Sequence, residues 1–185
     1  MIGVLVSGEG TNLQALLDAD LPIAAVASNV CGAGALERAA QASVPAAVFE
    51  LADYASRAAR DETMADWLAE HSVELVVCAG YMHLLTPPFL ARFPVLNVHP
   101  SLLPAFPGTR ALEAALDAGV SETGVTVHFV DAGIDSGPVI VQERVPVRPG
   151  DTPDTLRARI HEVEHRLLPA AARRLLAGAL RSPAL

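Results

Sequence analysis

The stretch "IGVLVSGEGTNLQALLDA", residues 2–19, decides the fold class because it joins a strand to a helix through a glycine-containing loop. Residues 2–6 form a continuous apolar run, which is typical of a strand buried on both faces. Residues 11–19 place their leucines at helical spacing. A buried strand followed at once by a helix predicts a parallel sheet covered by helices.

The same alternation continues along the chain. Further strands are predicted at residues 22–28, 46–50, 73–80 and 95–98, and further helices at 34–42 and 56–72. After Gly119 the pattern changes to two strands, 123–131 and 137–147, with only a short glycine-containing link between them. This link favours an antiparallel pair, so we predict a Rossmann-like, doubly wound α/β fold with a mostly parallel sheet and an antiparallel C-terminal strand pair.

A final helix is predicted over residues 152–180, capped by Thr152 or Asp154 and kinked or divided at Pro169. The 185 residues are most simply one domain, 1–185. Hydrophobic residues make up 51% and charged residues 18%, a composition that argues against disorder.

Charge and composition exclude several classes of function. The net charge of −8 argues against nucleic acid as a partner. All 13 basic residues are arginine, which excludes Schiff-base lysine chemistry and a P-loop lysine. The first residues lack a basic segment before their short apolar run, and no run approaches the ~20 apolar residues of a membrane span. Cys31 and Cys78 lack CxxC spacing and are interpreted as buried free thiols, so a cytoplasmic protein is expected.

The loop "SGEGTNLQ", residues 7–14, follows the first strand and opens a helix. Its glycines let backbone N–H groups approach an anion at the positive end of the helix. The spacing is neither GxGxxG nor a Walker A motif, and a phosphate fits better than a large dinucleotide. The alternative is a tight turn in which Thr11 or Asn12 caps the helix.

Polar residues end the strand at 95–98, in "NVHPSLLP", residues 97–104. Residues two apart on a strand point the same way, so Asn97 and His99 are expected to share a site. An amide can donate to a developing oxyanion, and an imidazole exchanges protons near neutral pH. The best candidate for a partner carboxylate is Asp135 in "DAGIDSGPV", and Asp131 is its competitor.

Simpler interpretations exist for each residue. His99 is also compatible with a strand-end histidine bonded to backbone, and Asp135 with a turn residue. His128 is expected to be structural or to support the site, and Ser101 lacks the GxSxG context of a nucleophile. The two histidines of "HEVEH", 161–165, are predicted to lie on a solvated helix face, and no metal site is expected.

Five segments together resemble a known family: "SGEGTNLQAL", "CAGYMHLLTPPF", "LNVHPSLLPAFPG", "TGVTVHFVDAGIDSGPVI" and "VPVRPGDT". In this order they are similar to the phosphoribosylglycinamide formyltransferases of the folate-dependent formyltransferase superfamily. The resemblance covers nearly the whole chain. It implies the formyltransferase fold and a purine-synthesis reaction that moves a formyl group from 10-formyltetrahydrofolate, a co-substrate, to the primary amine of glycinamide ribonucleotide.

The resemblance also implies roles for residues. Asn97, His99 and Asp135 would be catalytic: Asn97 would hold the oxyanion, His99 would be cationic beside Asp135, and Asp135 would help to remove the amine proton. The ribonucleotide would contact Gly10, Thr11 and Asn12 through its phosphate and Glu164 through its sugar. The folate would contact Arg57, Met82, His83, Leu84, Leu85 and Val130 and the loop 131–135, and Leu103-Pro104 would be a cis peptide.

Two positions depart from the family pattern. The family commonly has arginine where this chain has His83, and histidines often occur where it has Thr109-Arg110. The resemblance implies small-molecule partners only, with no nucleic acid and no membrane, in a monomer or homodimer. A related folate-dependent formyltransferase, a formyltetrahydrofolate hydrolase and an idle folate- or nucleotide-binding module are the competing functions. Intact Asn97, His99 and Asp135 count against the idle module.

Overall fold

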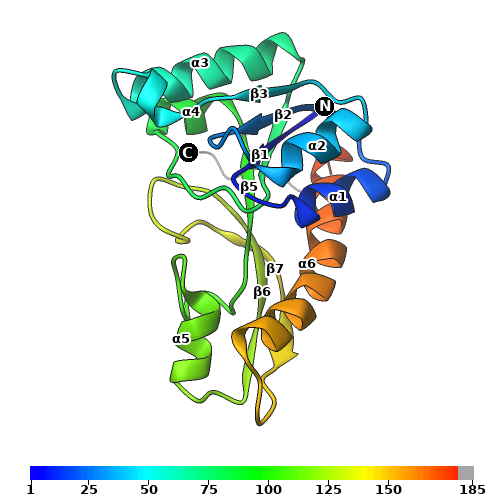
Figure 1. Cartoon of the computed structure of the whole chain (residues 1–185), viewed down its shortest axis with the longest axis vertical. Helices are drawn as coiled ribbons and strands as arrows, with labels where there is room; N and C mark the ends of the chain where they lie inside the picture. The colour runs from blue at the N-terminus through cyan, green and yellow to red at the C-terminus, as the bar shows by residue number, and fades with distance from the viewer. Residues whose placement is uncertain (179–185) are drawn as a thin grey trace.

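The computed structural model describes residues 1–178, which form a seven-stranded mixed sheet with helices on both faces (Figure 1). The strand order is β3-β2-β1-β4-β5-β6-β7. The strands are β1 (Ile2–Val6), β2 (Ile23–Ser28), β3 (Ala46–Val48), β4 (Leu75–Cys78), β5 (Val95–His99), β6 (Glu122–Phe129) and β7 (Val139–Pro146). Pairing is parallel from β3 to β5 and antiparallel for β5-β6 and β6-β7, which confirms the predicted fold class.

Four of the helices were expected from the sequence and two were not. The expected ones are α1 (Thr11–Asp18), α2 (Gly34–Gln41), α3 (Arg57–Glu70) and α6 (Pro153–Leu176). The sequence gives no signal for α4 (Pro87–Arg92), α5 (Ala111–Asp117) or the 3₁₀ turn Leu51–Asp53, because fewer than about two turns carry too little periodicity.

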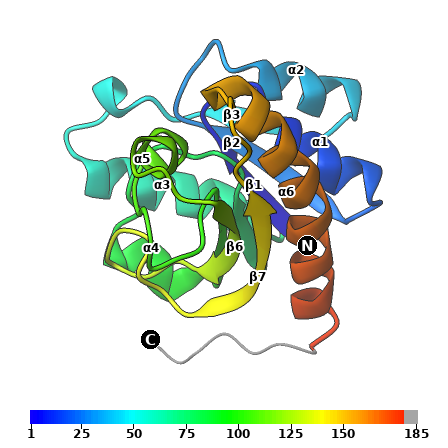
Figure 2. The same cartoon turned by 90° about the horizontal axis from the view of Figure 1, so that it is seen from below.

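Alternating side chains divide the core into two layers, one on each face of the sheet. From β4, Leu75 and Val77 pack toward α1, α2 and α6, whereas Val76 and Cys78 pack toward α3 and α4. Figure 2 shows α1, α2 and α6 grouped on one side of the strands. Strands covered on both faces need apolar side chains in both directions, which explains the continuous apolar runs in the sequence.

Helix α6 closes the layer that contains α1. Thr152 is its N-cap: the Thr152 hydroxyl accepts from the Thr155 N–H, and the Thr155 hydroxyl accepts from the Thr152 N–H. The helix runs on through Pro169 to Leu176, so of the predicted kink or division at this proline the division is wrong. Pro169, Leu167 and Leu168 are all buried, and this packing outweighs the loss of one backbone hydrogen bond. The last two residues of the predicted helix, 179 and 180, lie outside the described residues.

The two cysteines lie in different environments. Cys78 is buried at the end of β4, as predicted, and its thiol pKa is raised to about 12 by burial. Cys31 is exposed, so the prediction that it is buried is wrong. It lies in the loop between β2 and α2, where its N–H donates to Glu50. Loop residues lie at the surface whatever their polarity, and this explains the error.

Strand order predicts where a ligand binds. The chain leaves β1 toward β2 on one side, and β4 lies on the other side of β1. In open α/β sheets, ligands bind beyond the carboxyl ends of the strands at such a reversal. The loop after β1 with Gly10, the loop after β4 with Met82 and the end of β5 at His99 therefore meet at one end of the sheet.

Candidate active site

Asp135 gathers the polar residues at the ends of β5 and β6. Its Oδ2 lies 3.3 Å from His99 Nδ1, and its Oδ1 lies 3.4 Å from Asn97 Nδ2 and 3.6 Å from His128 Nε2. The Gly108 N–H also donates to Oδ2 at 2.8 Å. The structure thus brings together Asn97, His99 and Asp135, the three residues predicted to be catalytic.

Hydrogen bonding determines the protonation of His99. Its Nε2 lies 2.9 Å from the Phe106 carbonyl oxygen, which can only accept, so Nε2 carries a proton. Its Nδ1 faces the Asp135 carboxylate, which also only accepts when ionised. His99 is therefore a buried side chain that donates through Nε2 and places Nδ1 3.3 Å from a carboxylate oxygen.

Asp135 is suited to be the anion of this pair. Burial raises the pKa of its carboxyl, but the neighbouring His128, the Gly108 N–H and the charge of His99 together lower it below the ordinary value. Its backbone is left-handed, with φ 50°, a conformation that Asp tolerates better than most residues. The carboxylate is therefore ionised at neutral pH and held in a fixed position.

Asp131, the other candidate carboxylate, stabilises the turn at residues 131–136 instead of contacting His99. Its Oδ1 accepts from the Gly133 N–H at 2.9 Å and from the Ser136 hydroxyl at 2.8 Å. Both bonds are local and exposed, and they shape the loop in which Asp135 lies. Asp131 does line the small cavity next to Asn97, but among the described residues its side-chain bonds stay within the turn.

His128 supports the site, which is one of the two roles expected for it from the sequence. The antiparallel register places His128 directly opposite Asn97. Its Nδ1 donates to the Phe129 carbonyl at 2.8 Å, so Nε2 is free to accept from Asn97 Nδ2 at 3.1 Å. His128 therefore orients the Asn97 amide. A histidine within a predicted strand was the only sign of this role in the sequence. Its contact with Asn97 depends on the pairing of β5 with β6, which the sequence does not show.

Ser101 is part of the scaffold, as predicted. It is fully buried, and its hydroxyl donates to the Ala105 carbonyl at 2.5 Å. The Ser101 carbonyl accepts from the Thr126 hydroxyl at 2.7 Å. The Leu103-Pro104 peptide bond that follows is cis, as expected.

A cavity of about 350 Å³ lies between the β1–α1 loop and α6. It is lined by all four residues predicted to bind the ribonucleotide, Gly10, Thr11, Asn12 and Glu164. Asn12 Nδ2 donates to Glu164 Oε2 at 3.0 Å, and Asn12 Oδ1 has no hydrogen-bond partner within residues 1–178. Burial raises the pKa of Glu164 to about 7, although the Asn12 bond opposes this.

The β1–α1 loop exposes backbone rather than side chains. The N-cap of α1 is Gly10, in a left-handed conformation, and no side chain caps the helix, so the alternative of Thr11 or Asn12 as the cap is wrong. A Cβ on Gly10 would lie 2.6 Å from the Ala35 Cβ. The first N–H groups of α1 consequently remain available to an anion.

A second cavity, of about 390 Å³, lies beyond β4 and β5 and contains Asn97, His99 and Asp135 in its wall. A small adjoining cavity of about 80 Å³ shares Asn97 and Asp135. These two cavities are lined by five of the predicted folate-binding residues, Met82, His83, Leu84, Leu85 and Val130. Arg57 does not line them: it is exposed at the start of α3, near enough for its charge to lower the pKa of His83.

Sequence reasoning missed several residues that line these cavities. Arg157 and His161 of α6 line the cavity beside Glu164, and Tyr81 and Gly108 line the one beside Asp135. Their side chains or backbone reach the site from separate loops and from the helix face, so no local motif marks them.

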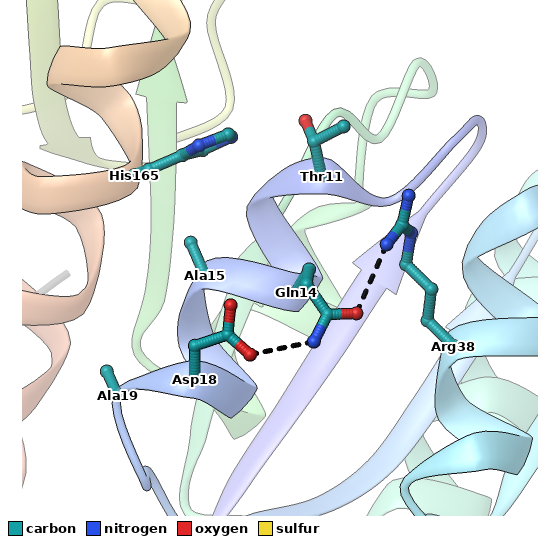
Figure 3. Close-up of a pocket in the computed structure, with 7 residues that line it drawn as sticks. All are labelled: Thr11, Gln14, Ala15, Asp18, Ala19, Arg38 and His165. Atoms are coloured by element: carbon teal, nitrogen blue, oxygen red, sulfur yellow. Dashed lines mark hydrogen bonds between the residues drawn. The ribbon is translucent and has the colours of Figure 1, made fainter.

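A further cavity, of about 480 Å³, lies on the other side of α1 and holds none of the catalytic candidates. Figure 3 shows Gln14 of α1 between Asp18 and Arg38, with His165 of α6 facing them across the cavity. Arg38 Nε also donates to the Glu9 carbonyl at 2.8 Å. Arg38 thereby fixes the loop that precedes α1.

Comparisons with known proteins define the class of this protein. Residues 1–172 match the model of the family described as formyl transferase. A glycinamide ribonucleotide transformylase structure from Symbiobacterium toebii superposes with a TM-score of 0.95, at 49% identity, over 98% of this chain and 90% of that one. The chain therefore belongs to the formyl transferase family and, within it, to the phosphoribosylglycinamide formyltransferases.

Two curated relatives differ in length. A phosphoribosylglycinamide formyltransferase from Mycobacterium tuberculosis is 51% identical over 176 residues, which cover 91% of this chain and 81% of the relative. A trifunctional purine biosynthetic protein from Chironomus tentans is 45% identical over 190 residues, covering 97% of this chain. The chain spans only 14% of that longer relative.

Within residues 1–178 no helix has both the length and the apolarity that a membrane span requires. The same residues contain no group of three or more His, Cys, Asp or Glu side chains arranged to hold a metal ion.

Proposed function

We propose that this protein transfers the formyl group of 10-formyltetrahydrofolate to the primary amine of glycinamide ribonucleotide. The proposal rests on two neighbouring cavities. Asp135, His99 and Asn97 lie in the wall of one, and the other lies behind the β1–α1 loop. Gly80, Met82, Val98 and Pro100 line both cavities, so an amine in one lies close to a formyl group in the other.

The amine nitrogen attacks the formyl carbon directly, and the carbonyl electrons move onto oxygen. Two groups are suited to this oxyanion: the Asn97 amide, which can redirect the N–H of its long 3.4 Å bond to Asp135, and His99, which can redirect its Nε2–H from the Phe106 carbonyl. Donors already held in a buried site stabilise such an intermediate. The Asp135 carboxylate, 3.3 Å from His99 Nδ1, holds the imidazole ring in this position.

The attacking amine then loses a proton to the Asp135 carboxylate, directly or through a water molecule. The intermediate collapses when the bond between the formyl carbon and N10 breaks. N10 takes up the proton, which yields the formamide and tetrahydrofolate. A general base is most effective when it is ionised and positioned, and both conditions favour Asp135 in this role.

The ribonucleotide occupies the cavity behind the β1–α1 loop in this proposal. Its phosphate is held by the N–H groups at Gly10, Thr11 and Asn12, at the positive end of α1. Glu164 accepts from or donates to the sugar hydroxyls, and its pKa of about 7 makes both forms accessible. Glu164 Oε2 already accepts from Asn12, so it ties α6 to the phosphate loop.

The folate occupies the cavity bounded by loop 82–85, Val130 and loop 131–135. Met82 and Leu84 are 58% and 46% exposed, which suits side chains that become covered by a flat heterocycle. Arg57 is proposed to face the glutamate carboxylate at the rim. No metal takes part. The proposal further takes the chain as one domain, 1–185, acting in the cytoplasm as a monomer or homodimer.

One assay tests the reaction. The protein is mixed with 10-formyltetrahydrofolate and glycinamide ribonucleotide, and the release of tetrahydrofolate is followed with and without the amine. Amine-dependent release is the expected result. Release that does not need the amine would point to a hydrolase, and no release at all would remove formyl transfer to this amine as the activity.

A further inference from the structure

Helix α3 carries a fully buried ion pair behind the proposed folate cavity. The side chains of Arg60 and Asp61 are 0% and 1% exposed. Arg60 Nε and Nη2 both donate to Asp61 Oδ1, at 2.9 and 2.6 Å. An arginine is rarely buried to this extent unless its N–H donors are bonded. The other contacts of Arg60 and Asp61 therefore show which part of the protein the pair supports.

The first of these contacts runs through Asp61. Asp61 Oδ2 accepts from the Thr86 N–H at 2.8 Å. Thr86 ends the segment that follows β4 and precedes α4, and this segment contains Met82, His83, Leu84 and Leu85. The buried pair therefore fixes the far end of the loop that lines the folate cavity.

The second contact is made by the guanidinium itself. Arg60 Nη1 lies 2.5 Å from His83 Nδ1. A guanidinium has only donors, so Nδ1 must accept and the His83 ring must be neutral, with its proton on Nε2. The pKa of His83 is lowered by burial first and by the charge of Arg60 second, with Asp61 acting in the opposite direction and Arg57 in the same one.

The near end of the loop is tied to the phosphate side. The Ser7 hydroxyl donates to Asn29 Oδ1 at 2.6 Å. Ser7 Oγ also accepts from the Met82 N–H at 2.9 Å. The loop is thus held at Met82 by Ser7, at His83 by Arg60 and at Thr86 by Asp61.

We propose that Arg60 is a positioning residue of the folate site, which sets the tautomer and orientation of His83 and, through Asp61, the conformation of loop 82–85. This inference rests on the proposed function for the identity of the ligand. Arg60 does not line the cavities itself, so its effect on folate passes through His83 and the loop.

A purely structural role predicts something different. In that case the loss of Arg60 would reduce the amount of folded protein and leave the affinities of the folded fraction unchanged. A positioning role predicts a selective loss of folate affinity, because Asn12 and Glu164, in the ribonucleotide cavity, make no bond to Arg60. The two roles are separated by comparing both substrates in one variant.

The test uses Arg60→Met, with Arg92→Met as the matched control. Arg92 also pairs with an aspartate of α3, Asp66, but both side chains are exposed. We expect Arg60→Met to raise KM for 10-formyltetrahydrofolate about tenfold, the effect of one lost charged hydrogen bond, with less than a twofold change for the ribonucleotide. Equal changes in both KM values, or none, would overturn the proposal.

A second pair of variants covers the case in which Arg60→Met does not fold. His83→Asn keeps an acceptor oxygen near the position of Nδ1, whereas His83→Leu removes it. Folate KM is expected to rise more in His83→Leu than in His83→Asn. Equal values for the two variants would count against a role for the bond from Arg60.

Binding of tetrahydrofolate by calorimetry tests the inference without turnover. If wild-type protein shows no formyl transfer but Arg60→Met still weakens tetrahydrofolate binding about tenfold, the inference holds and the proposed reaction fails. If transfer is observed and binding is unchanged in Arg60→Met, the inference alone fails. An NMR titration is expected to show a higher His83 pKa in this variant, since a neighbouring positive charge is removed.

Discussion

The two halves of the proposed active site are built differently. The phosphate half, at the β1–α1 loop, presents backbone N–H groups and excludes side chains, since Gly10 packs against Ala35. The catalytic half, at β5 and β6, presents ionised and polar side chains that bond to one another. The first half binds a negative charge through backbone N–H groups whose positions are set by the loop. The second half places the Asp135 carboxylate beside imidazole and amide groups, so the two halves should respond differently to mutation.

The largest effect is expected in the catalytic half. Asp135→Asn removes the proposed base and the counter-charge of His99, and kcat should fall about 10³-fold while both KM values stay within a few fold. His99→Ala should lose a similar factor. Steady-state kinetics provide the measurement. Asp131→Asn is the control, because Asp131 bonds only within its turn among the described residues, and a near wild-type kcat for Asp135→Asn would remove the assignment.

Glu164 should give the phosphate half a pH-dependent stability. Its pKa of about 7 in the folded protein exceeds the ordinary 4.5, so the folded state keeps a proton that the unfolded chain releases between these values. The stabilisation is complete below pH 4.5 and is lost as the pH rises through 7. Glu164→Gln, which stays neutral, should gain on wild type by up to about 3 kcal/mol between pH 4 and pH 8, with the two closest near pH 4.

Urea unfolding at several pH values measures this difference. Glu143→Gln is a suitable comparison, because the exposed pair with Arg166 lowers the pKa of Glu143 instead of raising it. Parallel stability profiles for wild type and Glu164→Gln would show that Glu164 does not titrate in this range.

Gly10→Val tests the backbone character of the phosphate half. Gly10 has φ 75°, and a Cβ there would lie 2.7 Å from the Ala35 Cα, so a β-branched residue must displace the loop. We expect KM for the ribonucleotide to rise on the order of tenfold, with KM for folate little changed. Gly8→Ala, where a Cβ meets nothing within 4 Å, is the control. An unchanged ribonucleotide KM in Gly10→Val would exclude the loop from the site.

Arg38→Met is expected to give the smallest effect. It removes the bonds from Arg38 to the Glu9 carbonyl and to Gln14 Oε1 and so loosens the phosphate loop from outside. Because these bonds are near solvent, KM for the ribonucleotide should rise only about threefold. Arg144→Met, at an exposed pair with Glu122, should leave it unchanged. A change in kcat rather than KM would contradict the division between the two halves.

Much of the fold was predictable because its signals are local. The apolar run at residues 2–6, the glycine loop and the capping Thr152 each act over a few residues, and all three match the structure. The short helices α4 and α5 were missed because they carry little periodicity. Pro169 does not divide α6, because the burial of the helix against the sheet outweighs the local preference of proline.

The site was only partly predictable. Asn97 and His99 share a strand, so their common direction follows from the alternation of side chains along it. The choice of Asp135 over Asp131, and the contact of His128 with Asn97, depend on the fold of a loop and on a strand register. Arg60 gave no signal, because a helical arginine next to an aspartate is normally exposed.

The sequence by itself determined the class of sheet, the anion-binding loop, the two catalytic candidates on β5 and the family resemblance, because these depend on local spacing along the chain. Only the tertiary structure decided which carboxylate pairs with His99, that Glu164 meets Asn12 across 152 positions of sequence, and that Arg60 is buried behind His83. Such pairings depend on distance in space and on the exclusion of water. The packing of helices and strands creates both, and no single segment specifies them.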